Sequence, residues 1–180
     1  MKYPIGIQSF EKIIENDYVY VDKTDLIYSM VKGGTIYFLS RPRRFGKSLL
    51  VSTLKNYFLG RKELFKGLAI DVLEKDWLTY PVFHIDFNGS DFQEKGTLEK
   101  VIEEYISTWE VAYGILPNPD RDRGMRFIQV LKEAHVRAGR RAVVLIDEYD
   151  KPMLDVLDTQ LETVVDGNKM LLEPDVVRRP

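Results

Sequence analysis

The sequence predicts an α/β domain built on a mainly parallel sheet, and three observations lead to this fold class. Short apolar runs alternate along the chain with longer stretches whose apolar residues recur at helical spacing. The first apolar run is nearly continuous, as in strands that are covered on both faces. Two of the runs are followed by polar residues suited to ligand binding at the carboxyl edge of a sheet. A layered domain with right-handed crossovers accounts for all three.

Three segments are the expected core strands of this sheet. They comprise residues 35–40, 81–87 and 142–146. Residues 35–40 are nearly continuous in apolar residues, so we expect this strand to be buried between helices on both faces. The third strand ends directly before two acidic residues, which we expect to lie at the carboxyl edge of the sheet.

Helices are expected between and after the strands because their apolar residues fall on one face. They cover residues 26–31, the stretch from the first loop to Gly60, residues 98–109, residues 127–138, and a segment that begins near Pro152. Gly60 and Gly139 follow such stripes and are expected to end their helices. Residues 61–80 show no clear pattern, so we expect irregular chain there.

The loop after the first strand has the composition of a phosphate-binding loop. Residues 41–48 read Arg-Pro-Arg-Arg-Phe-Gly-Lys-Ser. Backbone N–H groups of such a loop, together with the positive end of the next helix, can surround a triphosphate. Gly46 would let the backbone approach without a Cβ clash. The candidate nucleotide-binding residues are Arg43, Arg44, Phe45, Gly46, Lys47, Ser48 and Leu49.

Asp147 and Glu148 close the third strand and complete a Walker A and Walker B pair. We expect Lys47 to contact the β- and γ-phosphates of ATP and Ser48 to offer its hydroxyl to Mg2+. Asp147 is the second candidate Mg2+ ligand, through a water. Glu148 is the candidate general base, which makes Glu148 and Lys47 the expected catalytic residues. The motifs therefore predict ATP and Mg2+ as ligands.

Composition restricts the alternatives. The chain has 180 residues, no cysteine and a net charge of −2. These features exclude thiolate metal sites and a cysteine nucleophile, and no global field attracts nucleic acid or an acidic membrane. Because no segment has the pattern of a signal peptide or a membrane span, we expect a cytoplasmic protein without a membrane partner.

Four segments resemble the AAA-ATPase-like family of bacterial P-loop ATP-binding proteins. They are residues 4–10, 20–24, 38–48 and 145–152, and the resemblance extends over residues 3–162. It implies the three-layer sandwich of P-loop NTPases and ATP hydrolysis coupled to a further process. A usual P-loop begins with glycine, whereas this chain has Arg41 at that position. The loop resembles the family signature, which also lacks this first glycine.

The resemblance also implies parts that we do not find in this sequence. Family members continue with further core strands, a sensor residue and often a domain resembling PD-(D/E)XK nucleases, which would bring a nucleic-acid partner. We therefore expect a family-specific segment over residues 1–34, a partial P-loop ATPase domain over 35–162 and a divergent tail over 163–180. The C-terminal core strands would be missing, and the oligomeric state is left open.

The expected gap in the sheet has two consequences. A sensor strand would lie between the Walker A and Walker B strands, so we expect two unpaired strand edges. Residues 169–172 and 175–177 are apolar but shorter than a typical strand, and we expect no strand there. The chain by itself should then be marginally stable and a poor ATPase.

Three functions stay open on the sequence. The first is a Mg2+-dependent ATPase, the second is a nucleotide-binding switch with little hydrolysis, and the third is a small-molecule kinase with a P-loop. A kinase usually has an acceptor pocket and an arginine-rich lid after the Walker B region, and neither is evident in the sequence. A GTP-specific switch is disfavoured because the chain lacks an Asn-Lys-x-Asp motif.

Several polar residues near the motifs have structural alternatives. Arg43 and Arg44 either touch phosphate, pair with Asp150 or form a solvated basic turn. Asp86 either faces the metal or caps a turn, and the turn is favoured. Asp150 is expected to be the N-cap of the helix that contains Pro152.

The remaining candidates are expected to be structural. Asp22 and Thr24 either border the adenine pocket or cap a helix. His84 and His135 have no third ligand nearby in sequence, so zinc is not expected. The two tryptophans, Trp77 and Trp109, are expected in the core.

Overall fold

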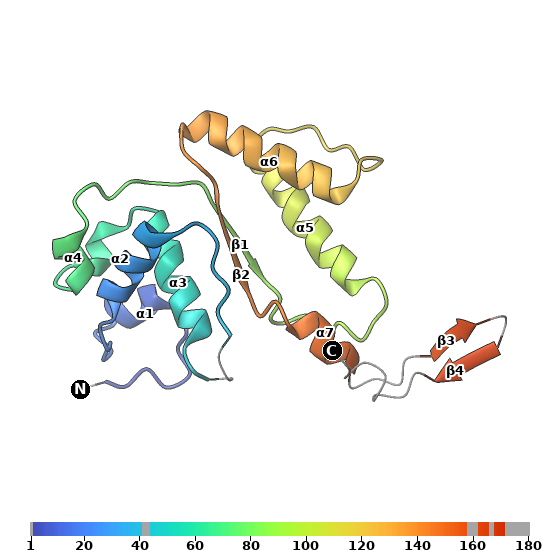
Figure 1. Cartoon of the computed structure of the whole chain (residues 1–180), viewed down its shortest axis with the longest axis horizontal. Helices are drawn as coiled ribbons and strands as arrows, with labels where there is room; N and C mark the ends of the chain where they lie inside the picture. The colour runs from blue at the N-terminus through green and yellow to red at the C-terminus, as the bar shows by residue number, and fades with distance from the viewer. Residues whose placement is uncertain (1, 41–43, 158–161, 166–167, 172–180) are drawn as a thin grey trace. The chain divides into compact units, whose positions relative to one another are not determined.

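The computed structural model describes residues 2–40, 44–157, 162–165 and 168–171. The chain divides into two compact units (Figure 1). Unit 1 comprises Met1–Ile85 and Lys132–Asp147, and unit 2 comprises Asp86–Leu131 and Glu148–Pro180. The loop at 44–48 and Asp147 belong to unit 1, whereas Glu148 belongs to unit 2.

Helices and strands are mixed along the chain, as in an α/β fold. In order they are α1 (Phe10–Glu15), α2 (Thr24–Gly33), α3 (Lys47–Phe58), the short 3-10 helix η1 (Lys62–Phe65), α4 (Ala69–Leu73), β1 (Val82–Asp86), α5 (Thr97–Ala112), α6 (Arg123–Ala138), β2 (Val143–Asp147), α7 (Lys151–Leu157), β3 (Glu162–Val165) and β4 (Asn168–Leu171). The predicted helices are confirmed, and Gly60 and Gly139 adopt the left-handed conformation just beyond α3 and α6.

The core of unit 1 lies among its helices α1 to α4 and η1. Phe10, Phe65 and Ile70 are completely buried there. The rings of Phe10 and Phe65 pack with their centroids 4.7 Å apart, and the ring of Trp77 lies 5.2 Å from that of Phe65. The predicted core role of Trp77 is therefore confirmed. Such aromatic burial removes a large apolar area from water and is the main stabilising term of this unit.

Strands β1 and β2 form a parallel pair. Beside the pair, the N–H of Val143 donates to the carbonyl of Pro81 at 2.8 Å. Helix α3 packs against β2, and Leu145 of β2 contacts the helical core. Both predicted strands at this position are confirmed, as is the α/β class. The three-layer sandwich stays a prediction, because among the described residues this sheet has two strands.

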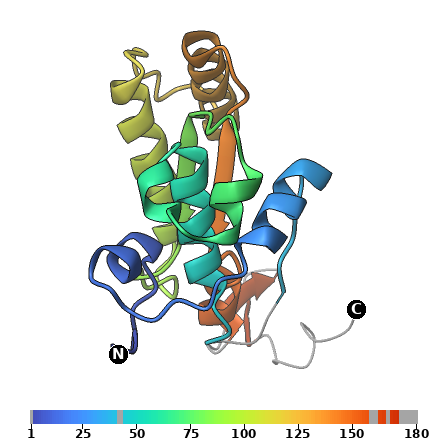
Figure 2. The same cartoon turned by 90° about the vertical axis from the view of Figure 1, so that its left-hand side faces the viewer.

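The predicted strand over residues 35–40 is wrong for the described structure. None of these residues belongs to a strand, and Figure 2 shows plain chain after α2. Ile36 is 92% exposed and Phe38 is 73% exposed. Instead, the hydroxyl of Tyr37 donates to the carbonyl of Met30 at 2.5 Å, which ties the segment to α2. A continuous apolar run suits a strand, but a strand forms only where a neighbour completes its hydrogen bonds.

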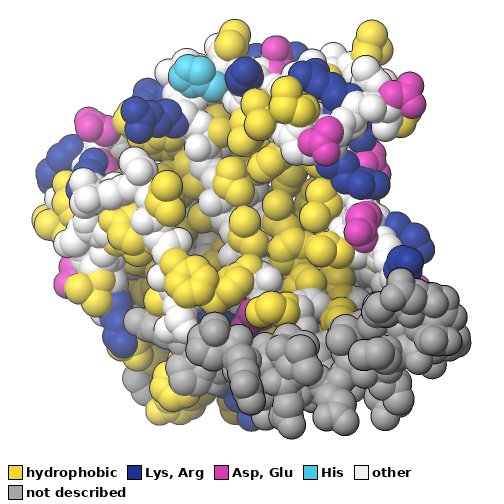
Figure 3. All heavy atoms as spheres, turned by 45° about the vertical axis from the view of Figure 1, so that its right-hand side comes forward, with side chains coloured by type: hydrophobic (Ala, Val, Ile, Leu, Met, Phe, Trp, Pro, Cys, Tyr) yellow, Lys and Arg dark blue, Asp and Glu magenta, His cyan; other side chains and the backbone are white. Residues whose placement is uncertain are grey.

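The expectation of a sheet covered on both faces is wrong as well. The burial of β2 alternates, with Val144 38% exposed and Ile146 47% exposed. Side chains of a strand point alternately to opposite faces, so β2 has one face against α3 and one open face among the described residues. Figure 3 shows that many hydrophobic side chains lie at the surface of the described structure.

Two elements lie where the sequence predicts irregular chain. Residues 61–80 contain η1 and α4, which are four and five residues long. The tail differs too: β3 and β4 pair antiparallel, although we expect no strand at 169–172. This hairpin forms a sheet of its own and does not extend the β1–β2 pair. Residues 175–177 lie outside the described residues.

Unit 2 contains α5, which packs through charged as well as apolar side chains. Arg126 of α6 is 3% exposed and forms ion pairs with Glu110 and Glu103 of α5. Ile106 and Val130 are buried, and the ring of Trp109 stacks with the rings of Tyr105 and Phe127. The expected core position of Trp109 is thus consistent with its ring contacts.

Candidate functional site

The first turn of α3 presents backbone N–H groups that no side chain caps. Gly46 is the residue before the helix, and no side chain caps the turn. The first helical hydrogen bond is from the N–H of Leu50 to the carbonyl of Gly46 at 3.0 Å. Within the described residues, the N–H groups of Lys47, Ser48 and Leu49 therefore have no acceptor. They point out of the positive end of a twelve-residue helix, where an anion is stabilised.

The backbone conformation of the loop explains its glycine. Gly46 has φ 74° and ψ 24°, in the left-handed region that favours glycine. A Cβ built at Gly46 would meet no atom within 4 Å. The protein's own atoms therefore do not crowd this position, and φ is the reason for glycine. Arg44 is also left-handed, with φ 68°, so the chain bends sharply twice before the helix.

The side chains of the loop differ in exposure. Arg44 and Phe45 are exposed, and Phe45 is 64% exposed, while Lys47, Ser48 and Leu49 are half-buried. In the described residues Arg44 has no ion pair. Its guanidinium is thus available for a phosphate or for water. The predicted residues Arg41, Pro42 and Arg43 lie outside the described residues.

Strand β2 brings Asp147 to the same end of unit 1. Figures 1 and 2 both show that α3 begins at the end of the unit where β2 stops. Asp147 is the last residue of β2 and is 6% exposed. A buried carboxylate is costly unless polar or charged groups surround it. The start of α3 and the acidic end of β2 thus lie at the same end of unit 1, and the nucleotide site expected there stays a prediction.

Glu148 begins a strained turn in unit 2. It is half-buried and has φ 50°, which is uncommon for a residue with a Cβ. Its carbonyl accepts the N–H of Lys151 at 3.0 Å, which closes the turn at the start of α7. Such outliers collect at functional sites, where surrounding contacts hold them. The sequence pattern identifies Glu148 but gives no sign of this conformation.

Asp150 occupies the N-cap position of α7, as predicted, but only through its backbone. Its carbonyl accepts the N–H of Leu154 at 2.9 Å. Its Oδ1 atom is buried and accepts no hydrogen bond from the described residues. Pro152 has no N–H to offer, which removes one of the usual donors to an N-cap carboxylate.

The residues fit Mg2+ by donor type. No group of three or more His, Cys, Asp or Glu residues in the described structure is arranged to hold a metal. Mg2+ seldom needs such a cluster, because it keeps several waters and uses one or two carboxylates with substrate phosphates. The Ser48 hydroxyl and the Asp147 carboxylate are oxygen donors of this type, whereas zinc sites usually include nitrogen or sulfur donors.

The structural alternative is confirmed for two further candidates. The Oδ1 atom of Asp86 accepts the N–H of Asn88 at 2.8 Å, so Asp86 forms a turn after β1. The Nδ1 atom of His135 lies 2.9 Å from the carbonyl of Arg140 and donates to it, which fixes the end of α6.

Asp22 and Thr24 cap two helices rather than one. The Oδ1 atom of Asp22 accepts the N–H of Thr24 at 2.9 Å, and its Oδ2 atom accepts the N–H of Ala69 at 2.7 Å. The hydroxyl of Thr24 accepts the N–H of Ile70 at 3.0 Å. Burial would raise the pKa of Asp22, but the hydrogen bonds from Ala69 and Thr24 outweigh it and lower this pKa. These oxygens are occupied by backbone donors, which supports the capping alternative over an adenine pocket.

Comparison with known proteins identifies a family for the chain. The family model described as predicted AAA-ATPase matches residues 4–173. The chain belongs to this family. Membership in this family suggests nucleotide binding in general.

One curated relative has no assigned function. It is described as an uncharacterized protein in the vnfD 5' region of Azotobacter chroococcum mcd 1 and is 47% identical over 158 residues. The match covers 87% of this predicted AAA-ATPase chain and 30% of the relative's own length. No solved structure matches the chain. In the part of the chain that the structure describes, no helix combines the length and apolar character that crossing a membrane requires.

Proposed function

We propose that the chain is a P-loop domain that binds ATP with Mg2+ and hydrolyses it. The observation that carries this proposal is the uncapped first turn of α3, which follows Gly46 and lies at the same end of unit 1 as Asp147. The first N–H groups of every helix lack an intrahelical acceptor, and at α3 they lie beside a lysine and a hydroxyl, where a phosphate would be stabilised. The predicted sandwich of P-loop NTPases belongs to this proposal.

The binding step follows from charge and geometry. The triphosphate would receive the N–H groups at the start of α3, and the helix dipole would add partial positive charge. Lys47 would place its ammonium on the β- and γ-phosphates, and Arg44 would add an exposed cation. Phe45, at 64% exposed, is available to pack on the ligand. These contacts hold the phosphates without needing a deep pocket.

The hydrolytic step assigns one role to each acidic residue. Ser48 and Asp147 would hold Mg2+, which supplies charge neutralisation to the phosphates when it is bound. Glu148 would accept a hydrogen bond from the attacking water and orient it towards the γ-phosphate. Phosphoryl transfer depends mainly on position and charge, so these few groups suffice for the reaction.

The binding assignment is tested with Lys47→Ala. Titration of ATP with Mg2+, followed by calorimetry, should show at least about a tenfold weaker affinity, because one full charge on the phosphates is lost. Lys55→Ala is the matched control, since Lys55 is exposed on the same helix. An unchanged affinity of the Lys47→Ala variant would contradict the proposal.

The hydrolytic assignment is tested with Glu148→Gln. This variant should bind ATP normally and release no phosphate, because the amide keeps the shape of the side chain but cannot take the proton. Glu104→Gln, at an exposed position of α5, is the control. Phosphate release at the parent rate in Glu148→Gln would remove Glu148 from the mechanism.

A further inference from the structure

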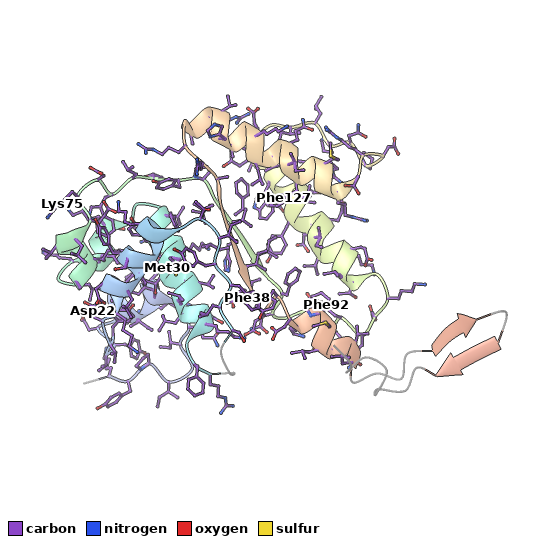
Figure 4. The ribbon with its side chains drawn as sticks, viewed as in Figure 1. Asp22, Met30, Phe38, Lys75, Phe92 and Phe127 are labelled. Carbon is purple, nitrogen blue, oxygen red and sulfur yellow. The ribbon has the colours of Figure 1, made fainter. Side chains whose placement is uncertain are left out.

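The ammonium of Lys151 joins the start of α7 to another segment of unit 2. It donates to the carbonyl of Ser90 at 2.9 Å and to the carboxylate of Asp155. It also lies 5.4 Å from the centre of the Phe92 ring, within range of a cation–π interaction. The side chain of Lys151 is only 27% exposed. Figure 4 shows Phe92 beside α7.

These contacts are more than an ordinary surface ion pair. Lysine and aspartate four residues apart on an exposed helix contribute little. Here, however, Asp155 is 24% exposed and also accepts the N–H of Phe92 at 3.5 Å. Phe92 itself is 5% exposed and packs on Phe87 with ring centroids 5.9 Å apart. Lys151 and Asp155 thus hold the backbone of residues 90–92 against α7.

The same lysine is the last residue of the turn that begins at Glu148. Its N–H donates to the Glu148 carbonyl at 3.0 Å, and Glu148 has the unfavourable φ of 50°. A strained residue persists only where its surroundings over-determine it. Within unit 2, the backbone of Lys151 closes the turn and its side chain fastens the turn to residues 90–92.

We propose that Lys151 is the positioning residue of Glu148. This inference rests on the proposed hydrolytic function of Glu148. Lys151 holds the start of α7 on the segment 90–92 and so fixes the direction in which the Glu148 carboxylate leaves the turn. Lys151 touches neither substrate nor reacting atoms in this assignment. A misplaced water costs rate far more than it costs nucleotide binding, because position dominates phosphoryl transfer.

Lys151→Met tests the proposal because methionine keeps the aliphatic stem and removes the charge. Steady-state phosphate release and ATP titration on the full chain should show kcat reduced at least about tenfold, with ATP affinity within about twofold of the parent. Lys151→Arg should recover most of kcat, since the guanidinium can again donate to the Ser90 carbonyl and lie near the Phe92 ring. Lys100→Met, at an exposed position of α5, should leave kcat unchanged.

Asp155→Asn keeps the test decisive if Lys151→Met fails to fold. This change weakens the hold on Lys151 and on the Phe92 N–H, so kcat should fall by less than in Lys151→Met and without a change in KM. Exchange of the backbone amide hydrogen at position 151 should be faster in both variants, because the turn opens more often.

The outcomes separate this inference from the proposed function. An inactive Glu148→Gln together with a fully active Lys151→Met would overturn the positioning role and leave the ATPase assignment intact. Equal losses of ATP affinity and kcat in Lys151→Met would also overturn it, since a merely structural role predicts that pattern. A parent chain that releases phosphate no faster than Glu148→Gln would overturn both, and unchanged exchange of the amide at position 151 would overturn the positioning role independently of activity.

Discussion

The helical core of unit 1 and the α5–α6 contact of unit 2 are both buried, but by different chemistry. In unit 1, Phe10, Phe65 and Ile70 are fully buried. These apolar side chains need close packing but no hydrogen-bond or ion-pair partner. In unit 2, Arg126 is 3% exposed and Glu110 is 1% exposed, so two opposite charges lie inside. Apolar burial tolerates small changes of shape, whereas a buried charge depends on one partner in one place.

The geometry of the charged cluster is specific. The Nε and Nη2 atoms of Arg126 donate to the two oxygens of Glu110 at 2.9 and 2.7 Å, which is a bidentate pair. Its Nη1 atom donates to Glu103 at 2.6 Å. The hydrogen bonds to Glu110 and Glu103 raise the pKa of Arg126 further, and that to Arg126 lowers the pKa of Glu103. Such pairs define the register of two helices more than they stabilise them.

The largest expected loss of stability comes from a substitution that removes this ion pair. Arg126→Ala leaves Glu110 buried without its partner and should lower the free energy of unfolding of unit 2 by about 3–5 kcal/mol. Chemical denaturation of single-tryptophan variants measures it, since Trp109 reports on unit 2 and Trp77 on unit 1. The Trp109 transition should shift to lower denaturant.

The matched control is the exposed pair of Arg137 with Glu133. Arg137→Ala should change stability by less than about 1 kcal/mol. Replacing both Arg126 and Glu110 with apolar residues of similar size should recover most of the loss, because no charge is then stranded. A small effect of Arg126→Ala would show that the two cores do not differ in the way described.

An effect of intermediate size comes from a buried carboxylate within unit 1. Glu74 is 5% exposed, accepts the hydroxyl of Tyr57 at 2.5 Å and pairs with Lys32 at 3.1 Å. Burial would raise the pKa of Glu74, but the bonds from Tyr57, Asp76 and Lys32 outweigh it and lower this pKa to about 2. Burial and the bond to Glu74 raise the pKa of Tyr57, which stays a neutral donor.

The pH dependence of stability follows from the sign of this shift. The folded pKa lies below the unfolded one, so the contribution of Glu74 is complete above about pH 5 and is lost as the pH falls towards 2. Its size is on the order of 3 kcal/mol. Glu74→Gln should therefore be less stable than the parent at pH 7, and the difference should shrink by pH 3. Thermal or urea unfolding across that range measures it. A difference that does not change with pH would exclude the linkage.

The smallest expected loss of stability tests the side-chain cap that joins α2 and α4 in unit 1. Asp22→Ala removes the acceptor of the Ala69 and Thr24 N–H groups and should cost about 1–2 kcal/mol. Asp25→Ala, one turn away on the exposed side of α2, should change stability by less than about 1 kcal/mol. The Trp77 transition is the readout, and the Trp109 transition should stay in place. If the two variants lose the same stability, the second helix cap is not a stabilising contact.

The sequence by itself determined the elements that depend on local pattern. The stripes over residues 98–109 and 127–138 specify α5 and α6, because helix periodicity alone decides which face is apolar. Gly46 and the residues after it specify an uncapped helix start, since its conformation and the missing cap are properties of neighbouring residues. The acidic end of β2 follows from the apolar run before it.

Only the tertiary structure decided the features that depend on distant partners. The start of α4 is capped by Asp22, 47 residues before Ala69, so residues 61–80 carry no local sign of a helix. Residues 35–40 have the composition of a strand and are not one in the described structure, because hydrogen bonds to a neighbour decide that state. The buried Arg126 and the strained Glu148 are likewise set by contacts across the fold. The periodicity of apolar residues indicates which face of a helix or strand is buried. It does not indicate which distant residue forms the hydrogen bond or ion pair of a given polar group.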